Sequence, residues 1–243
     1  MLRGVDYADS DRVVTLLTRR FGKASFIARG ARRSKKRFGG ALQPLQLLSV
    51  EISQSAARLG SLARAEVVRT FPRVLGDLPR MAAAFTATEL VRELLPEHEP
   101  DAGVFGTVLD MFAALDAGEL VPERLSLCFQ VRLLSLCGFA PQLDCCGLCG
   151  KRPAAGQTAS FDAHLGHLVC RGCGGGSERI AGSVRALLMR AGGADWVLAA
   201  RAPCLDGELA GARAALRAFI EHRIGRPLRS TALSAVASQE PDT

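Results

Sequence analysis

The residues of this sequence best suited to chemistry are two pairs of cysteines. Cys146 and Cys149 stand in CGLCG, and Cys170 and Cys173 repeat the same spacing in CRGCG. Two such pairs, with about twenty residues between them, match a four-thiolate zinc site. The glycine after each pair tolerates the positive φ of a tight turn whose amides face the sulfur atoms. Because four thiolates leave no open position on the ion, we expect one zinc with a structural role.

Other uses of the cysteines remain open at the level of sequence. Two redox disulfides would also fit the pairs, although the βαβ pattern that accompanies a thioredoxin-like CxxC is absent. Cys145 adjoins Cys146 and offers an alternative ligand with a less usual spacing. His164 and His167 lie between the pairs and are candidates to displace a thiolate. The remaining cysteines are most simply interpreted as buried thiols: Cys128, Cys137 and Cys204.

Motifs of common enzymes do not fit the chain. A nucleobase deaminase needs His-x-Glu and Pro-Cys-x-x-Cys, but no histidine has Glu two residues later and no proline precedes either CxxC. No GxxxxGKS/T motif is present to bind nucleotide phosphates. The acidic segment DYADSDR, residues 6–12, lacks the glycine and terminal glutamate of a calcium loop, so we interpret it as a turn between strands. We therefore expect a protein that is not an enzyme.

The second candidate site is a run of positive charge near the N-terminus. Residues 19–37 include nine Lys and Arg but no Asp or Glu, and five of the nine fall within RRSKKR. The whole chain carries a formal charge of +7 at pH 7, so the remainder is slightly acidic. The nine residues are Arg19, Arg20, Lys23, Arg29, Arg32, Arg33, Lys35, Lys36 and Arg37.

This basic run favours a polyanionic partner. Clustered like charges repel one another unless an anion neutralises them, so binding to nucleic-acid phosphates is the preferred interpretation. A nuclear-localisation signal has a similar composition. A membrane-surface helix would need an apolar face, which GARRSKKRFGG lacks. Phe38, beside the glycines, is the best candidate to stack on a base, and we expect it and the nine basic residues to contact nucleic acid.

The elements that must position these residues fall into a strand-rich part and a helical part. Apolar and β-branched runs predict a hairpin with its turn at Gly22 and Lys23, and four strands overall, at 13–18, 24–29, 42–53 and 62–70. Four short strands with a long basic loop predict a small barrel, of which the OB-fold is a common single-strand binder. Beyond Pro72 the apolar period becomes helical, and a buried helix at 123–139 and a helix capped by Asp206 are predicted.

These patterns predict an α+β fold, an N-terminal OB-fold barrel followed by an all-helical domain with an inserted four-cysteine zinc ribbon. The expected bounds are 1–71 for the barrel, 72–144 and 177–227 for the helical domain, 145–176 for the ribbon and 228–243 for a disordered tail. No stretch approaches the ~20 apolar residues of a membrane span, and the N-terminus lacks a signal-like core. We expect a cytoplasmic protein with no membrane partner.

The order of these features resembles the RecO family of bacterial DNA repair proteins. The resemblance rests on DYADSDRVVTLLTRRFGK, on ARGARRSKKRFGGALQPL and on the paired CxxC that begins LDCCGLCG, and it extends from Asp6 to about Arg226. It implies a recombination mediator that binds single- and double-stranded DNA and anneals strands coated with single-strand-binding protein. It also implies that the chain acts with RecR to load RecA. In that case Arg32, Arg33, Lys35, Lys36 and Arg37 form the DNA contact, and the four paired cysteines bind zinc.

One departure from the family concerns the first strand. RecO proteins have several more residues ahead of the motif that here reads DYADSDR, whereas only Met1 to Val5 precede it. Either the given start is too late or the barrel is incomplete, and in the second case the barrel would lose ladder hydrogen bonds at one strand and expose an edge. The departure also puts RecR docking, which the family assigns to this domain, in question.

Two other functions fit the same features. A small barrel, a basic loop and a zinc ribbon would also serve an RNA-binding or ribosome-associated protein, and a preference for DNA over RNA would separate the two. A protein-interaction scaffold is the third interpretation, in which the basic patch binds an acidic peptide such as the tail of single-strand-binding protein.

Overall fold

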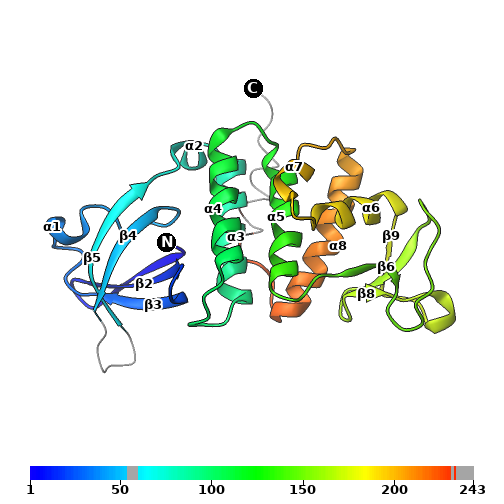
Figure 1. Ribbon diagram of the computed structural model, residues 1–243, viewed down its shortest axis with the longest axis horizontal. Coiled ribbons are helices and arrows are strands. Elements are labelled where there is room, and N and C mark those ends of the chain that lie inside the picture. The colour runs from blue at the N-terminus through cyan, green and yellow to red at the C-terminus, as the bar shows by residue number, and fades with distance from the viewer. Residues whose placement is uncertain (54–59, 231–232, 234–243) are drawn as a thin grey trace.

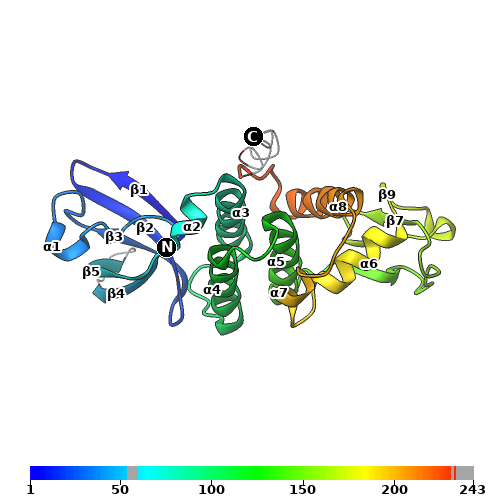
Figure 2. The ribbon, with the colours of Figure 1, turned by 90° about the horizontal axis from the view of Figure 1, so that it is seen from above.

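The computed structural model describes residues 1–53, 60–230 and 233, without the side chain of Lys35. The molecule is elongated, with a strand-rich barrel at one end, helices in the middle and a small ribbon at the other end (Figure 1). The three parts stay in a row when the molecule is seen from above (Figure 2). The α+β class predicted from the sequence is confirmed.

Five strands form the N-terminal sheet, in the order β1-β2-β3-β5-β4. They are β1 (Arg3–Tyr7), β2 (Asp11–Thr18), β3 (Gly22–Ala28), β4 (Leu47–Ser53) and β5 (Gly60–Arg69). Strands β3 and β5 pair in parallel and the other neighbours are antiparallel. Within the described residues no ladder joins the edge strands β1 and β4, yet backbone bonds link Met1 to Leu45 and Gln46, just before β4. This open five-stranded sheet is consistent with an OB-fold.

Alternating side chains build the barrel core. Along β3 every second residue is buried, and the apolar side chains of β2, including Val14 and Leu16, face the same interior. The period-two pattern expected around Leu48, Val50 and Ile52 is present, and these three side chains pack partly buried against that core. A strand buries one face in this way because successive side chains point to opposite sides.

Two details of the barrel differ from the expectation. Strand β1 forms and pairs with β2 from Arg3 to Tyr7, so the first strand was missed as an element. The hairpin turns at residues 19–21, and Gly22 already begins β3. Its φ of 62° is in the region that favours glycine, and the absence of a Cβ atom lets the chain pass close to the backbone of Glu99. The acidic segment does turn, at residues 8–10, between β1 and β2.

The helical part begins after the barrel with α2 (Pro72–Leu75) and α3 (Leu78–Leu94), followed by α4 (Ala102–Ala117) and α5 (Pro122–Leu136). Asp77 and Asp101 cap α3 and α4 by accepting backbone N–H groups with their side chains. Helix α5 is the predicted buried helix, and it packs Leu125, Phe129 and Leu133 into the main core. Helices α6 (Gly182–Ala191), α7 (Trp196–Ala199) and α8 (Asp206–Ile224) complete this part.

Helix α8 differs from the expectation at its start. Leu205, rather than Asp206, is the N-cap, and its backbone N–H donates to the Glu208 carboxylate at 3.1 Å. The predicted apolar stripe is present, with Ala212, Leu216 and Phe219 among its buried residues. Within the described residues, no helix is both long and apolar enough to cross a bilayer.

The ribbon lies between α5 and α6 in the chain. Its sheet has the order β6-β8-β7-β9, with β6 (Gln142–Cys146), β7 (Ala159–Asp162), β8 (His167–Leu168) and β9 (Glu178–Ile180). A single 3-10 turn, η1 (Arg171–Cys173), precedes β9. These strands extend a few residues beyond the predicted bounds of 145–176 on both sides, because β6 and β9 close the ribbon sheet.

The segment after α8 is ordered at its start, contrary to the predicted disorder from residue 228. Leu228 and Ser230 are buried, and the backbone N–H groups of Arg229 and Ser230 donate to the Glu89 carboxylate on α3. The expectation of a loose tail is therefore wrong for residues 228–230, since a buried carboxylate binds their backbone. Residues 231–232 and 234–243 lie outside the described part.

Candidate metal centre and nucleic-acid interface

The four paired cysteines converge at one point of the ribbon. The Sγ atoms of Cys146, Cys149, Cys170 and Cys173 all lie within 4.8 Å of one another, and those of Cys149 and Cys170 are 3.7 Å apart. A tetrahedral ion with metal–sulfur bonds of about 2.3 Å separates its sulfur ligands by about 3.8 Å. The donor set and its spacing therefore fit a four-coordinate, thiophilic metal ion.

Glycine turns shape both halves of this centre. Gly150 and Gly174 have φ of 73° and 106°, the left-handed region that the sequence predicted for them. The N–H of Gly150 donates to Cys146 O at 2.8 Å, which closes the first turn. Across the centre, Cys170 N–H donates to Cys146 Sγ at 3.4 Å, so a backbone amide does face a ligand sulfur.

These hydrogen bonds favour a thiolate at Cys146. The backbone N–H groups of Cys170 and Cys149 lower the pKa of Cys146 to about 6. The Cys173 thiol donates side-chain hydrogen bonds to Cys149 and Cys170, which raises the pKa of Cys173 to about 12. Because a metal ion binds thiolates, its arrival would displace the remaining protons, and acid would weaken its binding.

The alternative ligands stand apart from the centre. Cys145 accepts a hydrogen bond from Gln142 at 3.1 Å, and the described residues place neither it nor a histidine in the metal-binding group. His164 instead packs against His222 on α8, with ring centres 4.2 Å apart. None of the eight cysteines forms a disulfide, and burial raises the pKa of Cys128 to about 11, as expected for a buried thiol.

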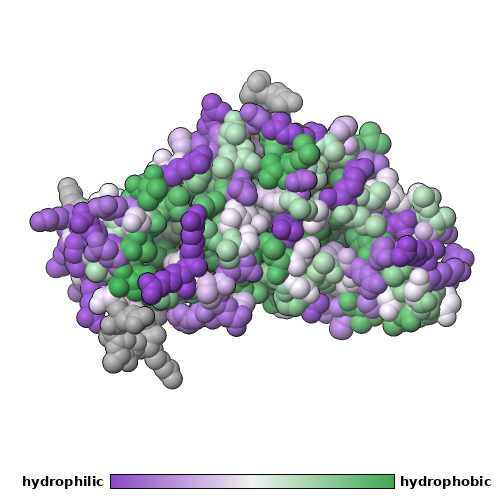
Figure 3. All heavy atoms as spheres, viewed as in Figure 1, coloured by the Kyte–Doolittle hydropathy of each residue, from purple (hydrophilic) through white to green (hydrophobic). Residues whose placement is uncertain are grey.

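Part of the predicted basic run gathers at the tip of the barrel. Arg29, Arg32, Arg33, Lys36 and Arg37 are exposed there, around the short helix α1 (Lys35–Phe38), and we call these five residues and Lys35 the basic rim. Hydrophilic residues crowd this end of the molecule (Figure 3). The basic rim is thus an open, strongly cationic surface at the end farthest from the ribbon (Figure 1).

Acidic residues that the sequence assigned to a simple turn anchor this rim. Asp11 accepts the N–H of Gly30 at 2.7 Å, and Asp6 pairs with Arg12 at 2.9 Å. Asp6 also lies 4.0 Å from Arg32. The charge of Arg32 is therefore partly balanced in space, although no acid is near it in the sequence. Only the pairing of β1, β2 and β3 brings these groups together.

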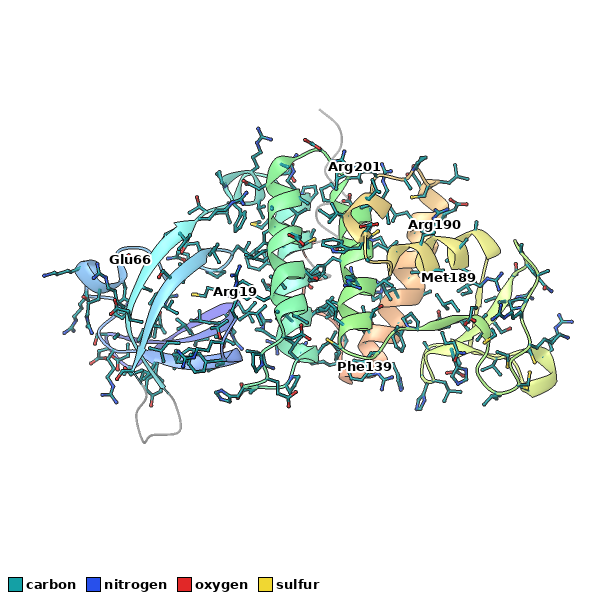
Figure 4. All side chains as sticks on the ribbon, viewed as in Figure 1. Arg19, Glu66, Phe139, Met189, Arg190 and Arg201 are labelled. Atoms are coloured by element: carbon teal, nitrogen blue, oxygen red, sulfur yellow. The ribbon has the colours of Figure 1, made fainter. Side chains whose placement is uncertain are left out.

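The other three predicted DNA contacts lie elsewhere. Arg19, Arg20 and Lys23 sit at the opposite end of the β2–β3 hairpin, roughly 20 Å from the rim for a seven-residue strand. Arg19 stacks on Phe105 of α4 at 5.0 Å (Figure 4), and Lys23 Nζ donates to Arg92 O of α3 at 2.7 Å. The nine residues thus form two groups. The hydrogen bond of Lys23 joins the barrel to helix α3.

A cavity of about 610 Å³ lies beside this second group. It is lined by Arg19 and Arg20 and by apolar side chains of the barrel and α4, such as Leu48 and Phe105.

Phe38 is not available to stack on a base. Its side chain is 2 % exposed and belongs to the barrel core, with the Arg37 guanidinium over the ring at 5.2 Å from its centre. The prediction of a stacking role is wrong because α1 turns the ring inward to close one end of the barrel. The exposed ring at this end of the sheet is instead that of Tyr7, which is 58 % exposed at the end of β1 and pairs with Asp11 of β2.

Comparison with known proteins decides the family. Residues 1–71 match the family described as "Recombination protein O N terminal", and residues 75–232 match "Recombination protein O C terminal". The chain belongs to the RecO family. The resemblance found in the sequence is thereby confirmed, and RecO membership makes this a protein of DNA repair and recombination.

Individual RecO proteins are similar over most of the chain. "DNA repair protein RecO" of Anaeromyxobacter sp. (strain K) is 43% identical over 232 residues, which cover 94% of this chain and 91% of that protein. The protein of the same name from Myxococcus xanthus (strain DK1622) is 39% identical over 230 residues, covering 95% and 92%. That of Geobacter sulfurreducens is 37% identical over 174 residues, covering 72% and 70%.

Proposed function

We propose that this RecO-family protein is a non-enzymatic mediator that binds single- and double-stranded DNA and anneals complementary strands. The observation that carries the proposal is the basic rim, where the side chains of Arg29, Arg32, Arg33, Lys36 and Arg37 are exposed together. Such a surface binds the phosphate backbone by releasing condensed counterions and reads no bases. Two polyanionic strands approach each other more easily once this charge screens their repulsion.

Zinc is the ion that we propose for the cysteine centre. Four thiolates in a tetrahedral arrangement select zinc among the common divalent ions, and no position remains for water. The ion supplies cross-links between the two glycine turns and takes no part in chemistry. The residues that would hold it are Cys146, Cys149, Cys170 and Cys173.

The partners that we propose follow from the family. RecR, single-strand-binding protein with its acidic tail and, indirectly, RecA are the expected partners in recombinational repair. The pairing of β1 with β2 from Arg3 to Tyr7 supports a five-stranded N-terminal sheet on which RecR would dock. A bacterial protein with this role would act in the cytoplasm, at the nucleoid.

The decisive experiment is annealing of complementary oligonucleotides coated with the cognate single-strand-binding protein, without ATP. We expect rapid duplex formation, and we expect single-strand affinity to fall with salt with a slope of about −0.7 per phosphate neutralised. Replacing two exposed rim residues, in Arg33→Glu/Lys36→Glu, should flatten the slope and slow annealing at least several-fold.

A matched variant controls for net charge. Arg190→Glu/Arg217→Glu removes the same charge from exposed positions on α6 and α8, away from the rim, and should leave the slope unchanged. Equal losses from both variants would contradict a local rim interface. No annealing by folded, metal-loaded protein would overturn the proposal, and tighter binding to RNA than to DNA would favour an RNA-binding role.

A further inference from the structure

A second cationic surface lies at the other end of the molecule, beside the metal centre. A pocket of about 420 Å³ opens on the ribbon, and two cysteines of the metal centre, Cys146 and Cys170, line part of it. Among the described residues, its lining also includes four basic side chains and no carboxylate: Lys151, Arg152, Arg171 and Arg179. Hydroxyl and amide groups of Thr158, Ser160 and Gln157 add neutral hydrogen-bonding groups to the same wall. This volume is in the range of ligand pockets, and the lining is suited to an anion.

The walls of this pocket are held in place by the surrounding fold. Lys151 is tied to the first cysteine turn, because Cys146 N–H donates to Lys151 O at 2.9 Å. The loop that follows is fixed by the buried Arg185 of α6, whose Nη2 donates to Ala154 O at 3.0 Å. On the far wall, Arg179 pairs in register with Ser160 across β7 and β9. The pocket is therefore built before any ligand arrives.

Charge balance of the metal centre does not account for all of these cations. Four thiolates and one zinc ion carry a net charge of −2. Asp144 lies 3.7 Å from Arg152 and balances it in part, which leaves Lys151, Arg171 and Arg179. Each of these three is exposed and lines the pocket. Three cations against the charge of −2 on the centre leave an excess of one positive charge, and an external anion can bind to the exposed groups.

The ligand class follows from the shape and charge of the surface. Several exposed cations spread around an open pocket suit the successive phosphates of a nucleic-acid backbone, which guanidinium and ammonium groups bind with little dependence on sequence. An aromatic ring is absent from the lining, so base stacking has no part in this site.

We propose that this ribbon pocket is a second DNA-backbone site, at the end of the molecule opposite the basic rim (Figure 1). This inference deepens the proposed function and rests on it, since DNA must be the ligand of the protein as a whole. A chain with two such sites contacts a strand at two separate places, or contacts two strands at once. The helices between the sites act as a rigid spacer.

The test uses the metal-loaded, full-length double variant Lys151→Gln/Arg179→Gln. Binding of a fluorescein-labelled oligo(dT) of about 30 nucleotides is followed by anisotropy across a salt series. Loss of two phosphate contacts should reduce the magnitude of the salt slope by about 1.4, and each single variant should reduce it by about 0.7. The matched control Arg190→Gln/Arg217→Gln should keep the wild-type slope.

Zinc content and melting temperature distinguish this role from simple charge balance. In our proposal the variants keep about one zinc per chain and melt as the wild type does. A variant that loses zinc or melts early but, once reloaded with metal, keeps the wild-type slope would overturn the proposal, because its cations then serve only the thiolates. An unchanged slope with unchanged zinc would overturn it as well.

The same titrations separate this inference from the proposed function. If the salt dependence of oligo(dT) affinity becomes weaker in the ribbon variant but not in Arg33→Glu/Lys36→Glu, the ribbon site is supported and the rim interface is refuted. If the salt dependence becomes weaker in the rim variant alone, the ribbon site is refuted. A wild-type protein that binds no oligo(dT) at all overturns both.

Discussion

At the scale of single residues, the metal centre offers a sharp comparison between neighbours. Cys149 lies in the four-sulfur group, whereas Cys145 is outside it and accepts a hydrogen bond from Gln142. We predict that Cys149→Ser lowers the zinc content well below the value of about one per chain expected for an intact site. The loss should unfold the ribbon locally, since metal binding supplies folding free energy.

Elemental analysis and thermal melting of the two purified variants check this prediction. Cys145→Ser is the matched control, because it changes the same chemistry one residue from a ligand, and it should keep both zinc and melting temperature. Equal zinc loss from both variants would show that Cys145 substitutes for Cys146. Metal-free wild-type protein with unchanged melting would refute the metal centre altogether.

At the scale of elements, Glu89 joins α3 to the segment that follows α8. Its carboxylate accepts the N–H groups of Arg229 and Ser230 at 3.0 and 2.8 Å and pairs with Arg226 at 3.3 Å. Burial acts to raise the pKa of Glu89, but the hydrogen bonds from Ser230, Arg229 and Arg226 outweigh it and hold the pKa below its usual value of 4.5. The charged form therefore stabilises this contact.

We predict that Glu89→Gln costs about 1–3 kcal/mol of stability at pH 7, because a neutral amide replaces a buried carboxylate acceptor. A lowered pKa contributes stability above the unfolded value and loses it as pH falls through the folded value. The difference in unfolding free energy between Glu89→Gln and the wild type should stay constant from pH 7 to about 4.5 and decrease below that pH. Amide exchange at Arg229 and Ser230, corrected for the intrinsic rate at each pH, measures this contact locally.

The control is Glu93→Gln, which breaks the more exposed pair between Glu93 and Arg226. Exposed ion pairs contribute about 0–1 kcal/mol to stability. In this variant the backbone amides of Arg229 and Ser230 should therefore be protected from hydrogen exchange nearly as well as in the wild type. Protection in Glu89→Gln equal to that of the wild type at pH 7 would contradict the assigned role of the buried carboxylate.

Period and spacing in the sequence predicted the elements that depend on local chemistry. The strands β2 to β5, the buried helix α5 and the cysteine turns follow from side-chain alternation, apolar faces and glycine conformations that neighbouring residues determine. Long-range contacts were not predictable in the same way. The inward turn of Phe38, the separation of Arg19 from the basic rim and the docking of Ser230 on Glu89 each depend on partners distant in the chain.

The ribbon pocket was missed for the same reason. Its cations are dispersed between residues 151 and 179, among acidic residues, so no charge run marks them. The pairing of β7 with β9 and the cysteine turns bring them to one surface. The net charge of the ribbon sequence is close to zero, so a count of charged residues would not have revealed the cations that the fold gathers at the pocket.

At the scale of the whole molecule, the elongated arrangement sets the basic rim and the ribbon pocket at opposite ends (Figures 1 and 2). The packed cores of the barrel and the helices meet through contacts such as Lys23 with Arg92 and Arg19 with Phe105. These contacts limit bending between the ends. Annealing by such a molecule should then require both sites in one chain, since a chain with one site holds a single strand.

This reasoning predicts the behaviour of mixed variants. The rim variant Arg33→Glu/Lys36→Glu and the ribbon variant Lys151→Gln/Arg179→Gln, mixed in equal amounts, should anneal oligonucleotides no faster than the better of the two alone at the same total concentration. The double-site variant should be slower still. Stopped-flow fluorescence on strands coated with single-strand-binding protein measures these rates. Recovery of the wild-type rate in the mixture would show instead that the two sites act on separate molecules, as in an assembly where one chain supplies the rim and another the ribbon.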